Sequence, residues 1–227
     1  MLEEQPKMKF ASFVFFSSLE YISFFSFILI LFRFNIREYI LKFATFSIVL
    51  SLVSNTLQTE SLRAVSPLVQ AGLMICFVVF FLRVHLFNAT IMVTTGYLIN
   101  FIVSWIIATV TTHFGNIGEI EPYTRNAFIM QTASAFMMLM FGLVIYLQKG
   151  GFSFIENNSR FKRNKFFEKD NRPFLVFISL SIIAIFIVNL MFVLFKNLPN
   201  LFVSVFLFIA LLGLIYLSVK RDGRKND

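Results

Sequence analysis

The stretch FASFVFFSSLEYISFFSFILILFRFNIREYILK at residues 10–42 decides the class of fold. Its first part, residues 10–32, is an apolar run with Glu20 as its one charge, and Arg33, Arg37 and Lys42 follow it. An apolar run of roughly 20 residues is the length that an α-helix needs to cross a bilayer. Basic residues directly after such a run are typical of its cytoplasmic end. The stretch therefore predicts a transmembrane helix that runs inward.

The same pattern recurs along the whole chain, with short polar breaks between the apolar stretches. The predicted spans are residues 10–32, 39–57, 66–82, 86–111, 126–147, 173–195 and 199–219. Ser66 and Pro67 predict the start of the third span, with Ser66 as its N-cap. Span 86–111 is long enough to cross the membrane at a tilt. We expect an all-α polytopic bundle of seven transmembrane helices in one domain, residues 1–227, with a basic loop at 148–172.

The composition makes lipid the expected solvent for most of the chain. Hydrophobic residues form 58% of the 227 residues, and the mean hydropathy is +0.80. One soluble core of this size could not bury so much apolar surface. The net charge of +8 is expected in cytoplasmic loops, where it faces the anionic inner leaflet. The bilayer is therefore the expected partner, and nucleic acid is not.

The distribution of Lys and Arg sets the predicted orientation. The breaks after the first, third and fifth spans and the C-terminal tail hold all Lys and Arg residues except Lys7, Lys9, Arg63, Arg125 and Lys196. Cytoplasmic loops carry the excess of basic residues in membrane proteins. We therefore expect the N-terminus outside, the C-terminus inside, and a location in the plasma membrane.

Except for Asn88, the amide and acidic side chains of the predicted spans lie in their middle or outer half. The candidates for ligand contact are Glu20, Asn55, Gln58, Gln70, Asn100 and Gln131, and Asn189 lies at a similar depth. If they converge, they line a cleft open to the outside that suits a small polar or peptidic ligand. The sequence leaves open the alternative that they are isolated residues at the membrane interface.

Glu20 has two interpretations of equal weight. A carboxyl group within a membrane span is costly unless it is buried in the bundle and is protonated or partnered. On this interpretation it is a ligand anchor, or a proton or cation site. In the alternative, the first helix begins later and Glu20 lies at the outer interface.

Two predicted spans carry small or polar residues along one face. One face holds Ser47, Ser51, Ser54, Asn55 and Gln58, and the other holds Gly96, Asn100, Ser104 and Ala108. Small residues let membrane helices approach closely, and hydroxyls bond across the contact. Helix packing is favoured over a ligand surface for both faces.

The basic loop alternates Phe with Lys and Arg. Its candidates for contact with the inner leaflet are Arg160, Lys162, Arg163 and Lys165. Phe in the interface and charges at anionic headgroups would hold such a segment on the membrane. The simpler interpretation is a cytoplasmic loop with no further role.

Motifs for catalysis or metal binding are weak. Cys76 and His85 could form a thiol–imidazole pair of an intramembrane peptidase, but their spacing gives no reason for contact and no third group is evident. His113 with Glu119 and Glu121 favours a solvated acidic loop over a metal site. We expect no enzyme, no cofactor and no metal.

The predicted topology, with the stretches LFRFNIREYI at 31–40 and FFLRVHLF at 80–87, resembles a known family. It is similar to the multi-pass membrane sensor region of accessory-gene-regulator-type peptide-sensing histidine kinases of Gram-positive bacteria. The resemblance covers the seven spans and implies an extracellular peptide ligand. Those kinases continue into a phosphorylated His and an ATP-binding domain, which have no counterpart here, so we expect a sensor-like module without the kinase domain.

The sequence therefore favours a non-enzymatic, sensor-like membrane protein. An extracellular small or peptidic ligand would bias helix packing, and a cytoplasmic signalling partner would read the change. The alternative is the membrane subunit of a transporter that works with an ATPase, and an intramembrane peptidase comes third. The sequence does not decide whether the chain forms a homo-oligomer.

Overall fold

The computed structural model describes residues 4–58, 62, 65–114, 123–155, 171–195 and 201–226; within its helices, the side chains of 4–9, 112–114, 189, 191–195, 201–204 and 224–226 are not described. The described residues form helices and loops, with no strand. The helices are α1 (Glu4–Leu31), α2 (Ile36–Thr56), α3 (Ser66–Leu82), α4 (Leu86–Phe114), α5 (Arg125–Leu147), α6 (Arg172–Phe195) and α7 (Leu201–Asn226). The prediction of an all-α chain with seven helices is confirmed for this part of the chain.

The helix boundaries differ from the predicted spans mainly at the two ends of the chain. Helix α1 begins at Glu4, where an acidic residue suits the positive end of the helix dipole. Helix α7 continues through the basic tail to Asn226, since Lys and Arg are good helix formers and suit a helix C-terminus. The predicted cap of α3 is wrong: Val65 is the N-cap, and Ser66 is already helical.

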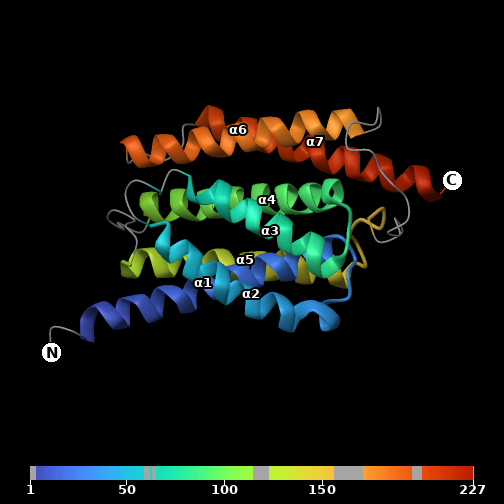
Figure 1. The fold of residues 1–227 in the computed structure, drawn as a ribbon. Coiled ribbons are helices and arrows are strands. Elements are labelled where there is room, and N and C mark those ends of the chain that lie inside the picture. Colours follow the sequence, from blue (N-terminus) through green and yellow to red (C-terminus); the bar gives the residue numbers. More distant parts are fainter. Residues whose placement is uncertain are drawn as a thin grey trace.

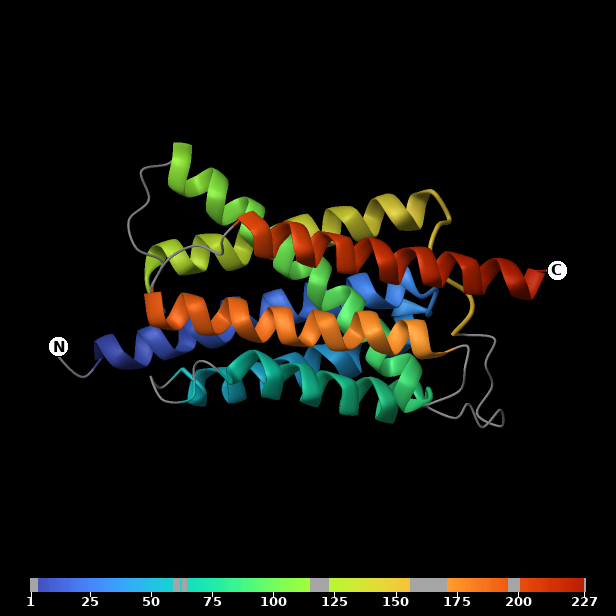
Figure 2. The same cartoon turned by 90° about the horizontal axis from the view of Figure 1, so that it is seen from above.

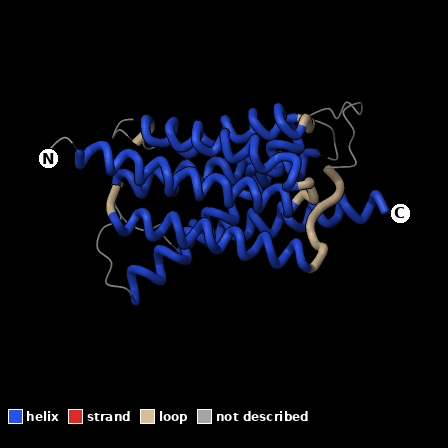
Figure 3. Tube along the Cα trace, turned by 90° about the horizontal axis from the view of Figure 1, so that it is seen from below, coloured by secondary structure: helices blue, strands red, loops and turns tan. Residues whose placement is uncertain are grey.

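The helices run roughly side by side, and the termini lie at opposite ends of the bundle (Figure 1). The end with the α1 N-terminus is called the N-terminal end here, and the end with the α7 C-terminus the C-terminal end. Helix α4 crosses the bundle obliquely (Figure 2), whereas loops connect the helices at the two ends (Figure 3). Helices α1 to α5 form a ring of neighbouring pairs, and α6 and α7 pack against α4.

Parts of the two small or polar faces are packing surfaces, and other parts line the cavity described below. On α2, Ser47, Ser51 and Ser54 are buried, and Ser51 accepts a hydrogen bond of 3.0 Å from Ser18 on α1. On α4, a Cβ added to Gly96 would lie 2.7 Å from the side chain of Ile28. Only a glycine allows α1 and α4 this approach, so the packing interpretation holds for these residues.

Apolar side chains of α1 fill the bundle toward the C-terminal end. Phe25, Ile28 and Phe32 are each at most 1% exposed. The Phe25 ring stacks on Phe43 of α2 at a centroid distance of 4.5 Å. This half of the bundle therefore has a dry, closely packed core.

A structured segment closes the C-terminal end of the bundle. The Phe152 amide donates a hydrogen bond of 2.7 Å to the Leu31 carbonyl at the end of α1. Arg33 donates from Nε to the Gly150 carbonyl at 3.1 Å and from Nη2 to the Lys149 carbonyl at 3.0 Å. Gly151 has a φ of +98°, and a Cβ there would lie 2.7 Å from the Leu31 carbonyl oxygen, so this position requires glycine.

The same segment is tied to α7. Asp222 accepts hydrogen bonds from the amide and the hydroxyl of Ser153, at 3.0 and 2.7 Å. The Arg221 guanidinium lies 5.4–5.8 Å from the ring centroids of Phe87, Phe154 and Phe174. Residues 149–155, together with Arg33, Arg221 and Asp222, are called the latch below.

Three helices are long and apolar enough to cross a membrane: Phe10–Leu31, Leu86–Thr111 and Arg125–Leu147. Two further apolar helical segments, Ser66–Leu82 and Arg172–Val188, are shorter. Much of α5 points outward, with exposed apolar side chains at Phe136, Leu139, Met140, Leu143, Tyr146 and Leu147. A continuous apolar surface of this kind is expected where a helix contacts lipid or a partner.

Candidate functional site

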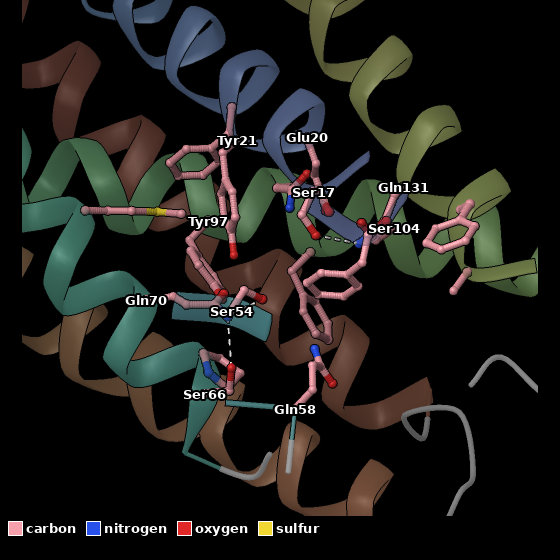
Figure 4. A pocket seen from close by; sticks show the side chains of 18 of the residues that line it. Ser17, Glu20, Tyr21, Ser54, Gln58, Ser66, Gln70, Tyr97, Ser104 and Gln131 are labelled. Atoms are coloured by element: carbon pink, nitrogen blue, oxygen red, sulfur yellow. Dashed lines mark hydrogen bonds between the residues drawn. The ribbon is translucent and has the colours of Figure 1, made fainter. Parts of the chain in front are cut away.

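A cavity of about 370 Å³ lies inside the ring of α1 to α5, in the half of the bundle toward the N-terminal end (Figure 4). Five of the six predicted ligand-contact residues line it: Glu20, Gln58, Gln70, Asn100 and Gln131. They come from five different helices or helix ends. The structure therefore brings together polar residues that are far apart in the sequence.

Helix α1 contributes one face to the cavity. Ser17, Glu20, Tyr21 and Phe24 all line it, and their spacing of three, one and three residues puts them on one helical stripe. Glu20 is half-buried and lies well within α1, so the interpretation that places it at the helix start does not hold. Asn100 of α4 lines the same cavity.

The end of α2 and the start of α3 form a second wall. Gln70 donates from Nε2 to the hydroxyls of Ser54 and Ser66, at 3.1 and 2.9 Å. These bonds hold the Gln70 side chain across the gap between the two helices. Ser66 therefore serves the cavity wall rather than the cap of α3, because its hydroxyl accepts from this amide.

Helices α4 and α5 form the opposite wall. Ser134 of α5 donates a hydrogen bond of 3.1 Å to Asn100 Oδ1 and lies 3.0 Å from the Ser104 hydroxyl. Gln131 donates from Nε2 to Ser17 of α1 at 3.2 Å. These bonds fix the amides of the wall in place, so the polar lining is preorganised.

Aromatic residues complete the lining, and the sequence reasoning missed them. Tyr21, Tyr97, Phe101 and Tyr123 are the main examples. A signal existed, because Tyr21 follows Glu20 directly, and Tyr97 precedes Asn100 by one helical turn and so shares its face. Phe24 and Tyr97 meet edge to face, with ring centroids 6.2 Å apart.

Asn55 does not line the cavity. Its Oδ1 accepts a hydrogen bond of 2.8 Å from the hydroxyl of Tyr123, and Tyr123 is the residue that lines the wall. Asn55 thus holds the side chain of Tyr123 in the cavity wall without lining the cavity itself. The side chain of Asn189 and the basic residues Arg160, Lys162, Arg163 and Lys165 lie outside the described residues.

The described residues of the weak catalytic and metal motifs do not come together in a site. Cys76 is exposed on α3, and His85 accepts a hydrogen bond of 3.4 Å from the Phe87 amide at the start of α4. Within the described residues, no group of three or more His, Cys, Asp or Glu side chains could hold a metal ion. Glu119, Glu121 and the side chain of His113 lie outside them.

The cavity has the size and character of a small-molecule site. Its volume falls within the range of roughly 300–1,000 Å³ that such sites occupy, and it combines apolar walls with a few fixed polar groups. Aromatic rings, amides, hydroxyls and one carboxyl group can bind a ligand, but they make no nucleophile–base pair. The chain matches no protein family, no curated protein and no solved structure.

Proposed function

We infer that the protein is a sensor-like multi-pass membrane protein that binds a small polar ligand in this cavity and signals through a cytoplasmic partner. The convergence of Glu20, Gln58, Gln70, Asn100 and Gln131 on one cavity is the observation that carries the proposal. Polar residues scattered along five spans would otherwise be costly in a membrane. A shared ligand site accounts for all of them.

The proposal places all seven helices in the plasma membrane of a bacterium, with the N-terminal end outside. Three helices are long and apolar enough for this, and the others run alongside them. Arg33, Arg37, Arg83 and Lys149 follow or begin helices at the C-terminal end of the bundle. The positive-inside rule makes that end cytoplasmic, so the cavity lies in the outer half.

Helix α1 gives the signal a physical route. It carries Ser17 and Glu20 at the cavity and ends at Leu31, whose carbonyl accepts from Phe152 of the latch. The latch is bonded in turn to α7 through Asp222. A ligand that shifts the preferred position of α1 would therefore change the latch and the α7 tail, which a partner could read.

The resemblance to accessory-gene-regulator-type sensors supplies the class of partner, whereas its implied peptide ligand differs from the small polar ligand proposed for this cavity. A histidine kinase or another protein of a response pathway would take the output role. This part of the proposal rests on the resemblance alone.

The topology can be tested with single cysteines, because Cys76 is the only cysteine of the chain. In a Cys76→Ala background, Leu62→Cys lies at an exposed position of the α2–α3 connection and Lys149→Cys lies at an exposed position of the latch. A membrane-impermeant maleimide should label the first variant on intact cells, and the second only after permeabilisation. The reverse pattern would overturn the proposed orientation.

Ligand binding can be tested by extraction from native membranes. We expect the purified wild type to retain a small molecule that a cavity-filling variant, Ser104→Phe, has lost. Thr132→Phe is the matched control, because Thr132 is exposed on the outer face of α5. Identical extracts from wild type and Ser104→Phe would contradict the proposal.

The same preparation identifies the output partner by mass spectrometry. A co-purifying kinase or response-pathway protein supports the sensor. An ATP-binding subunit, together with uptake or export of the retained molecule, would instead make this chain the membrane subunit of a transporter.

A further inference from the structure

We propose that the ligand of this cavity is a small organic cation, with Glu20 as its counter-charge and aromatic side chains around its ammonium group. This inference rests on the proposed function, because it takes the cavity to be a ligand site. It adds the charge and the chemical class of the occupant.

The charge follows from the lining. Glu20 is the only acidic residue among the described residues that line the cavity, and none of them is Lys, Arg or His. The nearby Asn100 is neutral, and its Oδ1 already accepts from Ser134. An ionised carboxyl group at this depth is costly unless it takes up a proton or meets an opposite charge. The wall offers none, so a cationic ligand is the natural partner.

The aromatic residues point to an organic cation. Tyr21 and Phe24 belong to the same stripe of α1 as Glu20, and Tyr97 lies one turn before Asn100 on α4. Figure 4 shows Glu20, Tyr21 and Tyr97 among the residues that line the cavity. A site that combines a carboxylate with aromatic rings can recognise an ammonium group, since the face of each ring carries partial negative charge. The edge-to-face contact of Phe24 with Tyr97 holds two of these rings in fixed positions.

The size of the cavity and the arrangement of its oxygen atoms argue against a bare metal ion as the ligand. A cavity of about 370 Å³ is far larger than such an ion, and Ca²⁺ needs six or more oxygen ligands at close range. The hydroxyls and amides here are spread over five helices, and several are already bonded to one another. The second wall, with Gln58 and Gln70, is left to bind a polar group on the ligand.

Choline and its neutral carbon isostere, 3,3-dimethyl-1-butanol, have nearly the same shape but differ in charge. Comparing their affinities therefore isolates the contribution of the charge. We expect choline chloride to bind the full chain in a non-ionic detergent at least about tenfold more tightly than the isostere. Calorimetry gives the two dissociation constants, with sodium chloride at equal ionic strength as the blank. Equal affinities, or no binding of choline, would overturn the cation inference.

Two pairs of variants test the residues. Glu20→Gln should remove the preference for choline, whereas Glu38→Gln, an exposed carboxylate bonded to Asn35 at the other end of the bundle, should keep it. Tyr97→Leu should weaken choline binding, while Tyr97→Phe keeps the ring and the affinity. The Tyr97 pair keeps the inference testable if Glu20→Gln fails to fold. A preference that survives both Glu20→Gln and Tyr97→Leu would overturn it.

The failure of this inference differs from the failure of the proposed function. If choline and its isostere bind equally and Ser104→Phe abolishes both, the cavity is a ligand site without selection for charge. If wild type and Ser104→Phe also yield identical native extracts, the proposed function fails as well.

Discussion

The two halves of α1 face opposite kinds of surroundings. Toward the N-terminal end, Ser17, Glu20 and Tyr21 border a cavity. Toward the C-terminal end, Ile28 and Phe32 are fully enclosed by apolar neighbours. The same bundle therefore packs closely in one half and stays hollow in the other. A packed half shows that these helices can close on one another, so the cavity in the other half depends on the particular residues that line it.

The largest effect is expected in the packed half. Phe32→Ala should destabilise the protein by about 3 kcal/mol, since Phe32 is 0% exposed and packs on Phe152 and Phe154. Phe136→Ala, at a position 61% exposed on α5, should change the stability by less than about 0.5 kcal/mol. Unfolding in mixed micelles measures both, and equal effects would contradict the packed core.

The second-largest effect on stability is expected in the latch. Arg221→Ala should cost about 1–2 kcal/mol, because it removes the guanidinium from three aromatic rings and from Asn171. Hydrogen exchange of residues 152–155 should rise in this variant and stay unchanged in Tyr216→Ala, an exposed position of α7. Unchanged exchange in Arg221→Ala would mean that Arg221 does not hold the latch.

The contact between α1 and α4 is sensitive to a single methyl group. Gly96→Ala should destabilise by roughly 1 kcal/mol, because its Cβ meets Ile28 at 2.7 Å. Gly72→Ala is the matched control, since its Cβ meets nothing within 4 Å and alanine favours the helix. Thermal unfolding of the two variants should shift in opposite directions, and a stabilised Gly96→Ala would contradict the close approach.

The smallest effect on stability is expected at the cavity. Ser17→Ala removes one hydrogen bond from Gln131 and should cost about 0.5–1 kcal/mol. Retention of the native ligand should nevertheless fall, because the wall loses a fixed polar group. A variant that loses stability as severely as Phe32→Ala would show that the two halves do not differ as proposed.

Three sequence-based expectations stay predictions: the resemblance to peptide-sensing kinases, the orientation in the membrane and the signalling role. The sequence-based prediction placed Glu20, Gln58, Gln70, Asn100 and Gln131 at a similar depth, and the structure brings them to one cavity; their contact with a ligand stays a prediction. It failed to separate Asn55 from the cavity, since Asn55 and Ser54 are adjacent and only the rotation of α2 decides which one faces inward. The latch could not be foreseen, because it depends on contacts between residues 149–155 and α7.

The sequence by itself determined the helices and the apolar character of their surfaces. Helix formation depends on local periodicity and composition, and α3 begins and ends at the predicted residues, Ser66 and Leu82. Only the tertiary structure decided which polar groups share a cavity and which aromatic rings line it together with Glu20. That outcome depends on how five helices are ordered and rotated around one another, and Gly96 and the serine pairs set this through contacts between residues far apart in the chain.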